Sequence, residues 1–217
     1  MEIKPIAFIE NDYKEKFGIP RQSGLVNLIS RIIFLPEYSD PNSMRGLEDF
    51  SHIWLIWGFS MIDDHKFYPT VRPPRLGGNV RKGVFSTRSP YRPNPLGLSV
   101  VKLEKMESNS ITVSGADLMN GTPIYDIKPY LPYIESIPDA SDGWALSTKE
   151  SVLSVNFPQE LLNMIPEDRR CGLLETLAQD PRPQYQNDPQ RVYTMSFGDF
   201  QISFHVDGDK LIVINVK

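Results

Sequence analysis

Residues Ile53–Phe59 read IWLIWGF and are the most apolar stretch of the 217-residue chain. This stretch is far shorter than the ~18–20 residues that a membrane-spanning helix needs, so it predicts a buried strand. Outward from it, further apolar and β-branched runs recur between turn residues: Ile3–Ile9, Gly24–Phe34, Asn79–Thr87, Gly97–Leu103, Ser110–Leu118 and Ile124–Pro129. Strands at this spacing, with no helical pattern between them, favour a closed or nearly closed β-barrel over alternating strands and helices.

A second, smaller unit is expected after the barrel. Ser136–Gly143 (SIPDASDG) is rich in Asp, Ser and Pro and predicts a linker. Pro158–Ala178 has a helical pattern that Pro166 is expected to split, and three alternating strands follow: Arg191–Phe197, Phe200–Val206 and Lys210–Val216. We therefore expect a mainly β chain made of a barrel domain, a linker and a small α+β domain: residues 1–138, 139–150 and 151–217.

The composition excludes several classes of protein. Hydrophobic residues are 40% and charged residues 23% of the chain, which argues against disorder and against fibres. A single cysteine, Cys171, rules out an internal disulfide framework and zinc-finger spacing, and it suits a reducing cytoplasm. The N-terminal MEIKPIAFIENDYKEKF lacks a cleavable apolar core, so no secretion signal is expected. These features predict a soluble, cytoplasmic protein with no membrane association.

Positive charge is concentrated in one segment of an acidic chain. The net charge is −4, but residues 65–103 hold eight Lys or Arg and no Asp or Glu, and the remainder has 15 basic against 27 acidic residues. Such a segment can supply a local field for a polyanion. The alternative is a solvated loop whose arginines pair with carboxylates elsewhere.

Several standard catalytic signatures are absent from the sequence. No G-x-G-x-x-G follows a strand, and Gly78-x-x-x-x-Gly83 is followed by Val-Phe, which a phosphate-binding P-loop would not have. The histidines are scattered, with no metal-binding spacing: His52, His65 and His205. His52 could act as a base, or it could be a capping or core histidine. We expect no metal site.

Val71–Leu98 (VRPPRLGGNVRKGVFSTRSPYRPNPLGL) combines glycine, proline and arginine at high density. Glycine lets the backbone approach a ligand, proline stiffens a loop, and arginine presents a fork for carboxylate or phosphate. The stretch predicts a binding loop, although a proline-rich barrel crossover would look similar. Three other clusters have the same character: Gly18–Leu25 (GIPRQSGL), Asp117–Pro132 (DLMNGTPIYDIKPYLP) and Asp180–Tyr185 (DPRPQY).

Long motifs in this order resemble the TsaA/YaeB family, whose bacterial members include TrmO-type tRNA methyltransferases. The matching stretches are Tyr13–Leu25, Arg45–Phe59, Val71–Ser99 and Asp117–Ser136, with DPRPQY in the C-terminal part. The resemblance implies a single-sheet β-barrel that binds S-adenosylmethionine without a Rossmann domain and forms a homodimer. It also implies methylation of the exocyclic amine nitrogen of threonylcarbamoyl-adenosine at position 37, next to the anticodon of threonine tRNAs.

By this resemblance, four stretches of the chain would bind the cofactor. Their residues are Pro20, Gln22, Ser23, Gly24 and Leu25; Phe59 and Ser60; Arg88 and Leu98; and Leu118, Met119, Asn120, Gly121, Thr122 and Pro123. We expect the backbone of the last stretch to read the adenine edge, because an Asn-Gly turn exposes amide groups that have no partner within the turn.

The candidate catalytic residues are Arg88, Asp126, Lys128 and Tyr130. Arg88 would fix an anion, either the methionine carboxylate of the cofactor or the threonyl carboxylate of the substrate. Its alternative is an ion pair with a carboxylate of this chain, such as Glu48, Asp49 or Asp126. Asp126 would orient or accept the proton of the acceptor nitrogen, although a structural pair with an arginine is equally open.

The expected tRNA contacts divide into backbone contacts and base stacking. Residues expected to face phosphates are Arg72, Arg75, Arg81, Lys82 and Arg92, and those expected to stack on bases are Tyr91, Arg182 and Tyr185. Two alternatives to the tRNA methyltransferase stay open. One is a methyltransferase for another acceptor, and the other is a non-catalytic tRNA-binding module.

Overall fold

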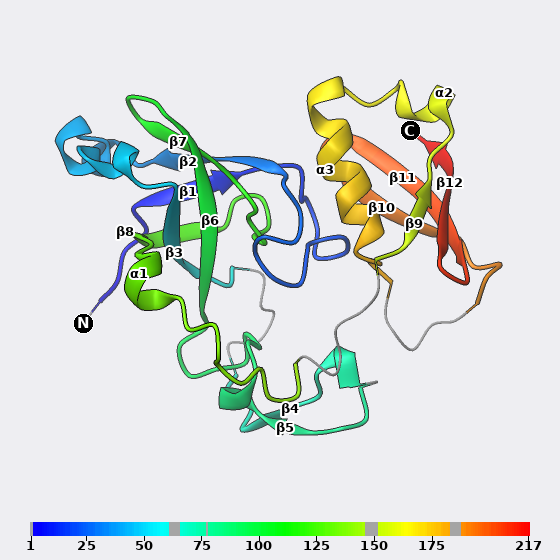
Figure 1. Cartoon of the computed structure of the whole chain (residues 1–217), viewed down its shortest axis with the longest axis horizontal. Coiled ribbons are helices and arrows are strands. Elements are labelled where there is room, and N and C mark those ends of the chain that lie inside the picture. The colour runs from blue at the N-terminus through cyan, green and yellow to red at the C-terminus, as the bar shows by residue number, and fades with distance from the viewer. Residues whose placement is uncertain (1, 61–65, 77, 146–151, 183–187) are drawn as a thin grey trace.

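The structure is a computed structural model that describes residues 2–60, 66–76, 78–145, 152–182 and 188–217 (Figure 1). The strands of the first part are β1 (Ala7–Glu10), β2 (Ile29–Phe34), β3 (His52–Gly58), β4 (Thr70–Val71), β5 (Lys82–Gly83), β6 (Leu96–Met106), β7 (Ser110–Ser114) and β8 (Pro123–Pro129). Its helices are the short turns η1 (Pro36–Tyr38), η2 (Pro41–Met44), η3 (Leu47–Asp49), η4 (Pro74–Leu76) and η5 (Val84–Ser86), and α1 (Pro132–Glu135).

Six of these strands form one antiparallel sheet. They are hydrogen-bonded in the order β1-β2-β7-β6-β3-β8, and β8 also pairs with β1, so the sheet closes into a barrel. Alternate residues of each strand point inward, as in β2, where Ser30, Ile32 and Phe34 are buried and their neighbours are more exposed. The inward side chains, among them Ile53, Leu55, Val101, Ile111 and Ile124, make one core. The prediction of a mainly β chain is confirmed.

Two of the predicted strands differ from the structure. Asn79–Thr87 was expected to be a strand, but it holds only the two-residue β5 and the turn η5, and Phe85 is 72% exposed. Glycine and proline on both sides keep this segment off the barrel, so its apolar residues do not mark a buried strand. In Gly24–Phe34, only the part from Ile29 onward pairs in the sheet, and the part before it is a loop.

The second part contains a four-stranded sheet and two helices. The elements are β9 (Ser154–Asn156), α2 (Gln159–Leu162), α3 (Glu167–Ala178), β10 (Tyr193–Phe197), β11 (Phe200–Asp207) and β12 (Lys210–Val216). The strand order is β10-β11-β12-β9, with β9 parallel to β12. Pro166 lies directly before α3 and separates it from α2, as predicted. The three predicted strands are confirmed, and β9 was missed because three residues carry too little pattern.

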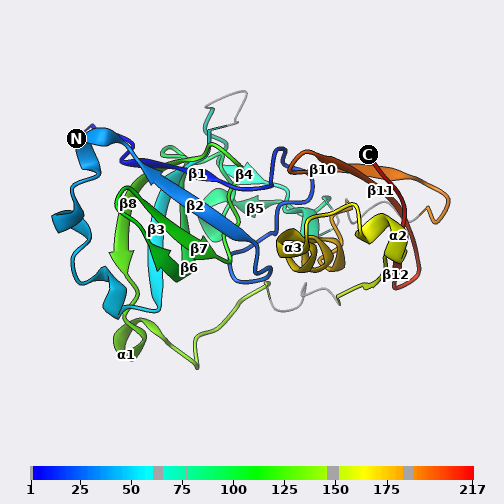
Figure 2. The same ribbon diagram turned by 90° about the horizontal axis from the view of Figure 1, so that it is seen from above.

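The two parts are in contact through α3. Figures 1 and 2 show α3 between the C-terminal sheet and the N-terminal loop that follows β1. Tyr13, Val26 and Leu28 of that N-terminal loop are buried in the hydrophobic core of the C-terminal part, not in that of the barrel. Within the described residues, none of the helices has the length and the apolar composition needed to cross a bilayer.

Candidate functional site

The loop of residues 18–25 contacts two other motifs that the sequence had singled out. Arg88, which follows η5, donates a hydrogen bond from Nη1 to Oε1 of Gln22. At the end of the loop, the N–H of Gly24 donates to the carbonyl oxygen of Gly115 at 2.9 Å, directly after β7. Gly24 has φ +78°, a conformation that favours glycine. The loop therefore lies between the Arg88 segment and the end of β7.

Asp117, which follows β7, contacts both the barrel strand β6 and the loop of residues 18–25. Its Oδ1 accepts a 2.6 Å hydrogen bond from the hydroxyl of Ser99 on β6, and that hydroxyl accepts from Nε1 of Trp57 at 3.0 Å. Burial raises the pKa of Asp117, while the Ser99 hydrogen bond, the charge of Arg88 and the backbone amide of Ser23 oppose the rise. A partly desolvated carboxylate with a raised pKa thus lies beside the loop and within the field of an arginine, which is a common property of ligand sites.

The turn at Leu118–Pro123 differs from the expectation in one respect. We expected its amide groups to be available to an adenine, but three of them are already paired. The N–H groups of Asn120, Gly121 and Thr122 donate to the carbonyl oxygens of Tyr13 (2.8 Å), Ile9 (2.7 Å) and Met119 (3.1 Å). These bonds hold the turn against β1 and the N-terminal loop, so this part of the expectation is wrong. The physical reason is that long-range backbone pairing satisfies the amides of Asn120 and Gly121, while the bond from Thr122 to Met119 closes the turn itself.

Asp126, Lys128 and Tyr130 lie together on and just after β8. Asp126 Oδ2 accepts from Lys128 Nζ at 2.8 Å, and its Oδ1 accepts from the N–H of Ile127 at 2.9 Å. This ion pair raises the pKa of Lys128. Tyr130 makes an edge-on contact with Trp54, with ring centroids 5.7 Å apart. Asp126 is therefore paired with a lysine, and not with Arg88 as one alternative proposed.

Phe59, Ser60 and Leu98 lie at the surface of the β3–β6 pair. Phe59 packs on Trp57, with ring centroids 4.4 Å apart, while Ser60 and Leu98 are exposed. Phe59 and Tyr125 line a pocket of about 180 Å³ together with Ile3, Gly58, Asn94, Pro95 and Leu96. Phe59 and Tyr125 make this pocket an aromatic slot.

The basic segment is the stretch of residues 66–102, and most of it lies between β3 and β6, outside the barrel. Its strands β4 and β5 are drawn at the bottom of Figure 1. Arg81 donates to Oγ1 of Thr70 at 2.8 Å across this strand pair, and Lys82 pairs in register with Val71. Arg72 and Arg81 are exposed. The side chain of Arg75 lies outside what the structure describes, as does His65.

The aromatic and arginine residues near the basic segment have different surroundings. Tyr91 is 40% exposed and makes an edge-on contact with Tyr68, with ring centroids 5.2 Å apart. Arg92 is half-buried and donates to the carbonyl oxygens of Thr87 (2.8 Å) and Val84 (3.4 Å). Arg92 therefore holds the η5 turn in shape, which leaves less of its guanidinium available to a phosphate.

Arg182 in the C-terminal part is also engaged. Its guanidinium donates to both carboxylate oxygens of Asp180, at 2.8 and 2.9 Å, and its side chain is only 10% exposed. Asp180 has φ +49°, which fits a turn directly after α3. Little of Arg182 is exposed for stacking on a base, and Tyr185 lies outside the described residues.

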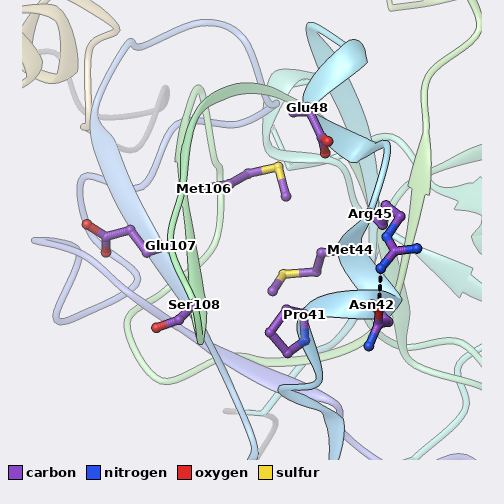
Figure 3. Close-up of a pocket in the computed structure, with 8 residues that line it drawn as sticks. All are labelled: Pro41, Asn42, Met44, Arg45, Glu48, Met106, Glu107 and Ser108. Atoms are coloured by element: carbon purple, nitrogen blue, oxygen red, sulfur yellow. Dashed lines mark hydrogen bonds between the residues drawn. The ribbon is translucent and has the colours of Figure 1, made fainter.

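A second, open pocket of about 450 Å³ lies at another place on the barrel (Figure 3). Met44 and Met106 point toward each other across it, and its wall is completed by Pro41, Asn42, Arg45, Glu48, Glu107 and Ser108. None of the expected site residues lines this pocket. In the described parts of the chain, no group of three or more His, Cys, Asp or Glu is arranged to hold a metal ion.

Two family models cover most of the chain. Residues 8–136 match the tRNA-methyltransferase O N-terminal domain, and residues 151–217 match the TrmO C-terminal domain. The chain belongs to the tRNA-methyltransferase O family. The sequence motifs resemble TrmO-type proteins, which are members of this family. The resemblance found in the sequence is therefore confirmed.

Individual members of the tRNA-methyltransferase O family align over nearly the full length. A tRNA (adenine(37)-N6)-methyltransferase of Escherichia coli K12 is 40% identical over 94% of this chain and 93% of that protein. A Pseudomonas aeruginosa protein, named as a candidate S-adenosylmethionine-dependent methyltransferase, is 38% identical over 97% of this chain and 94% of that protein. The crystal structure of TrmO from Pseudomonas aeruginosa has a TM-score of 0.82 at 31% identity, over 100% of this chain and 98% of that chain.

Within this family fold, the structure adds two residues that sequence reasoning missed. In the sequence, Asp117 stands out only as the first residue of a cluster, and Ser99 only as the last residue of a matching stretch. The signal that could have found Asp117 is its place directly after a buried run, Ile111–Ala116, where a carboxylate is desolvated. Ser99 gave no signal, since a serine inside a strand has many structural roles.

Proposed function

We propose that this chain is an S-adenosylmethionine-dependent methyltransferase that acts on the N6 nitrogen of adenosine 37 in tRNA. The names of the full-length relatives support the activity, the cofactor and the position of the base. Within this proposal, the substrate base carries a threonylcarbamoyl group and belongs to threonine tRNAs.

The observation that carries the proposal is that the loop of residues 18–25 contacts two other motifs, because Gln22 accepts from Arg88 and the amide of Ser23 donates to Asp117. The methionine end of S-adenosylmethionine carries one carboxylate and one ammonium group. Arg88 can bind the carboxylate in a forked arrangement, and the Asp117 carboxylate can accept from the ammonium. A zwitterion fits this pair of opposite charges better than a simple anion does, because a simple anion would leave Asp117 repelled.

When bound, S-adenosylmethionine supplies an electrophilic methyl group on a positively charged sulfur. The task of this chain is to align the acceptor nitrogen with that methyl group and to exclude water. Gln22, Arg88 and Asp117 would fix one end of the cofactor, and the aromatic slot beside Phe59 and Tyr125 would hold a planar ring.

The acceptor nitrogen also has to lose its proton. A carbamoyl-substituted amine is more acidic than the free amine of adenine, so a weak base is sufficient. In this proposal Asp126 accepts the proton at a carboxylate oxygen, and Lys128, 2.8 Å from Oδ2, orients the carboxylate. The pair is open to solvent, with the side chains of Lys128 and Asp126 61% and 46% exposed, so a bound tRNA can reach it.

The exposed Arg72 and Arg81 and the half-buried Lys82 would contact the phosphates of the anticodon stem-loop. Tyr91, 40% exposed, would stack on a base of the loop. Arg75 and Tyr185 stay in the proposal as expectations from the sequence. Arg92 and Arg182 would contribute mainly by shaping the loops on which they lie.

The proposal includes the domain division and a homodimer. Residues 1–138 and 151–217 hold separate sheets, each with its own core, and the C-terminal core also takes in Tyr13, Val26 and Leu28. The separate sheets support two domains joined by residues 139–150. Exposed apolar side chains occur on β6 and after it in α1: Leu96, Leu98, Tyr133 and Ile134. Such residues support an interface between two copies, and the mass of the particle in solution, measured by light scattering, tests it.

The experiment that tests the proposal is incubation with S-adenosylmethionine and threonine tRNA, prepared with and without the threonylcarbamoyl group, followed by nucleoside mass spectrometry. We expect a gain of about 14 Da, one added methyl group, on threonylcarbamoyl-adenosine and on no other nucleoside. The Arg88→Ala protein, purified in parallel, controls for a contaminating enzyme.

Two outcomes would contradict the proposal. A gain of mass in both tRNAs would show that the threonylcarbamoyl group is not required. No gain in either tRNA, with cofactor binding intact, would point to another acceptor or to a binding module.

A further inference from the structure

The loop of residues 18–25 is attached at its start to the C-terminal part of the chain. Tyr13 is 2% exposed, and its hydroxyl lies 3.1 Å from Oγ1 of Thr176 on α3. Thr176 donates its own proton to the carbonyl oxygen of Gly172 at 2.7 Å, so Tyr13 is the donor of the bond to Thr176. Phe17 stacks on Phe204 of β11, with ring centroids 6.4 Å apart and the planes within 3°.

Gly18, the first residue of the loop, has no room for a side chain. A Cβ placed there would lie 2.2 Å from Sδ of Met195 on β10, and its φ is +96°. Met195 is 1% exposed. The loop therefore begins pressed against the C-terminal sheet.

The end of the loop is attached to the same helix. Both carboxylate oxygens of Glu175 accept from Asn27: Oε2 from the backbone N–H at 2.6 Å and Oε1 from Nδ2 at 3.3 Å. Leu28 packs directly over Gly172 of α3, where an added Cβ would lie 2.7 Å from Cδ1 of Leu28. Glu175 and Thr176 are adjacent residues, so one turn of α3 holds both ends of the loop.

Between these two attachments, the loop presents Gln22 to Arg88 and the amide of Ser23 to Asp117. We propose that the C-terminal part is a clamp that sets the conformation of residues 18–25, with Glu175 and Thr176 as positioning residues for cofactor binding. This inference rests on the proposed function, in which Gln22, Arg88 and Asp117 bind the methionine end. The C-terminal part would then act on the cofactor site and not only on tRNA.

The physical reason is preorganisation. A loop with two glycines at positive φ has many conformations when its ends are free, and a ligand that needs one of them binds more weakly. Fixing both ends to one helix removes most of these conformations before the ligand arrives. Weakening one attachment should therefore lower the affinity for S-adenosylmethionine without changing the chemistry of the bound state.

The test compares Glu175→Ala, Glu175→Gln and Glu160→Ala in the full chain. Glu160 is a matched control, an exposed carboxylate on α2. Glu175→Ala should raise the dissociation constant for S-adenosylmethionine, measured by calorimetry, at least about fivefold. Under saturating cofactor, kcat should be unchanged. Glu175→Gln should recover most of the affinity, because its amide oxygen still accepts from the N–H of Asn27.

A second readout does not depend on the ligand. Amide hydrogen exchange of residues 18–25 in the ligand-free chain should be faster in Glu175→Ala than in the wild type, with the barrel strands unaffected. Tyr13→Phe, which keeps the ring and removes only the hydroxyl, should act in the same direction. It serves as the test if Glu175→Ala fails to fold.

Unchanged exchange and unchanged cofactor affinity in both variants would overturn the clamp. A fall in kcat at saturating cofactor, with the dissociation constant unchanged, would also overturn it. If the wild type itself does not bind S-adenosylmethionine, the proposed function fails, and faster exchange in the variants would still show that the clamp orders the loop.

Discussion

The hydroxyl of Ser99 donates a 2.6 Å hydrogen bond to Oδ1 of Asp117, and this bond connects the barrel interior to the candidate cofactor site. Ser99 is buried on β6 and accepts from Nε1 of Trp57, so its position is fixed by the core. The same carboxylate accepts from the backbone amide of Ser23, so Asp117 joins β6 to the loop of residues 18–25. The rigid sheet thus places a charged group that would be mobile on a loop alone.

The half-buried carboxylate of Asp117 predicts a specific pH dependence of stability. Its pKa in the folded chain lies above the ordinary 3.8, so the folded state holds this proton more tightly than the unfolded state. The favourable contribution is present below about pH 4 and is lost as the pH rises through the folded-state pKa. Asp117→Asn keeps the acceptor for Ser99 and removes the titration. Its free energy of unfolding, relative to the wild type, should therefore rise between about pH 4 and pH 7 in urea denaturation. A difference that is flat with pH would contradict the assignment.

Arg88→Ala should weaken the binding of S-adenosylmethionine about 10- to 100-fold, the usual effect of losing a hydrogen-bonded charge. Since Arg88 is exposed, the melting temperature should change little. Calorimetric titration measures the affinity, and Arg72→Ala, a change in another exposed arginine of the same segment, is the matched control. Normal cofactor affinity in Arg88→Ala would remove Arg88 from the site.

Asp126→Asn should lower kcat at least about tenfold and leave cofactor affinity unchanged, because Asp126 acts in the proposal on the acceptor nitrogen only. The exposed pair with Lys128 contributes little to stability, so the variant should fold normally. Asp139→Asn, at an exposed position after α1, is the control in single-turnover methylation assays. Equal rates for the two variants would show that another group, or water, takes the proton.

The two glycines of the N-terminal loop should differ in their tolerance of alanine. Gly24→Ala has open space and should cost only the positive φ, about 1–2 kcal/mol. Gly18→Ala has the same penalty and also displaces the buried Met195, which should add about 1–3 kcal/mol. Urea denaturation of both variants gives the difference in free energy of unfolding. Equal costs would mean that Met195 moves aside freely.

Replacing Arg81 and Lys82 together by alanine should weaken tRNA binding and reduce the slope of log K against log salt by roughly 2 units. The measurement is a filter-binding or fluorescence titration at several salt concentrations. Lys210→Ala combined with Lys217→Ala, at the first residue of β12 and directly after its end, removes the same charge at another place. If both double variants change the slope equally, the binding field is not confined to the basic segment.

Much of the fold could be predicted from the sequence. The strand at Ile53–Phe59 and the division of the C-terminal helices at Pro166 follow from local pattern, because apolar alternation and proline act within a few residues. The prediction of a strand over Asn79–Thr87 was wrong because it used the same local pattern alone. An apolar run such as Val84-Phe85 shows the composition of a strand, but only its neighbours in space decide whether it is buried.

The candidate site was predictable in part. Arg88 and Gln22 were named from their motifs, and the structure brings them into hydrogen-bonding contact. The expectation of free amides at Asn120-Gly121 was wrong. Both amides are paired, and their partners lie more than a hundred residues earlier in the chain, where no local pattern shows them. Whether these residues bind the cofactor stays a prediction that the experiments above test.

The sequence by itself determined a mainly β chain, a basic segment set in an acidic protein, and motifs that identify the family, because each of these depends on residues close together along the chain. Only the tertiary structure decided that Ser99 orients Asp117 and that one turn of α3 holds both ends of the loop of residues 18–25. The reason is distance along the chain. Glu175 and Asn27 are separated by 148 residues, and no local pattern encodes a contact that forms only when two separately folded cores pack together.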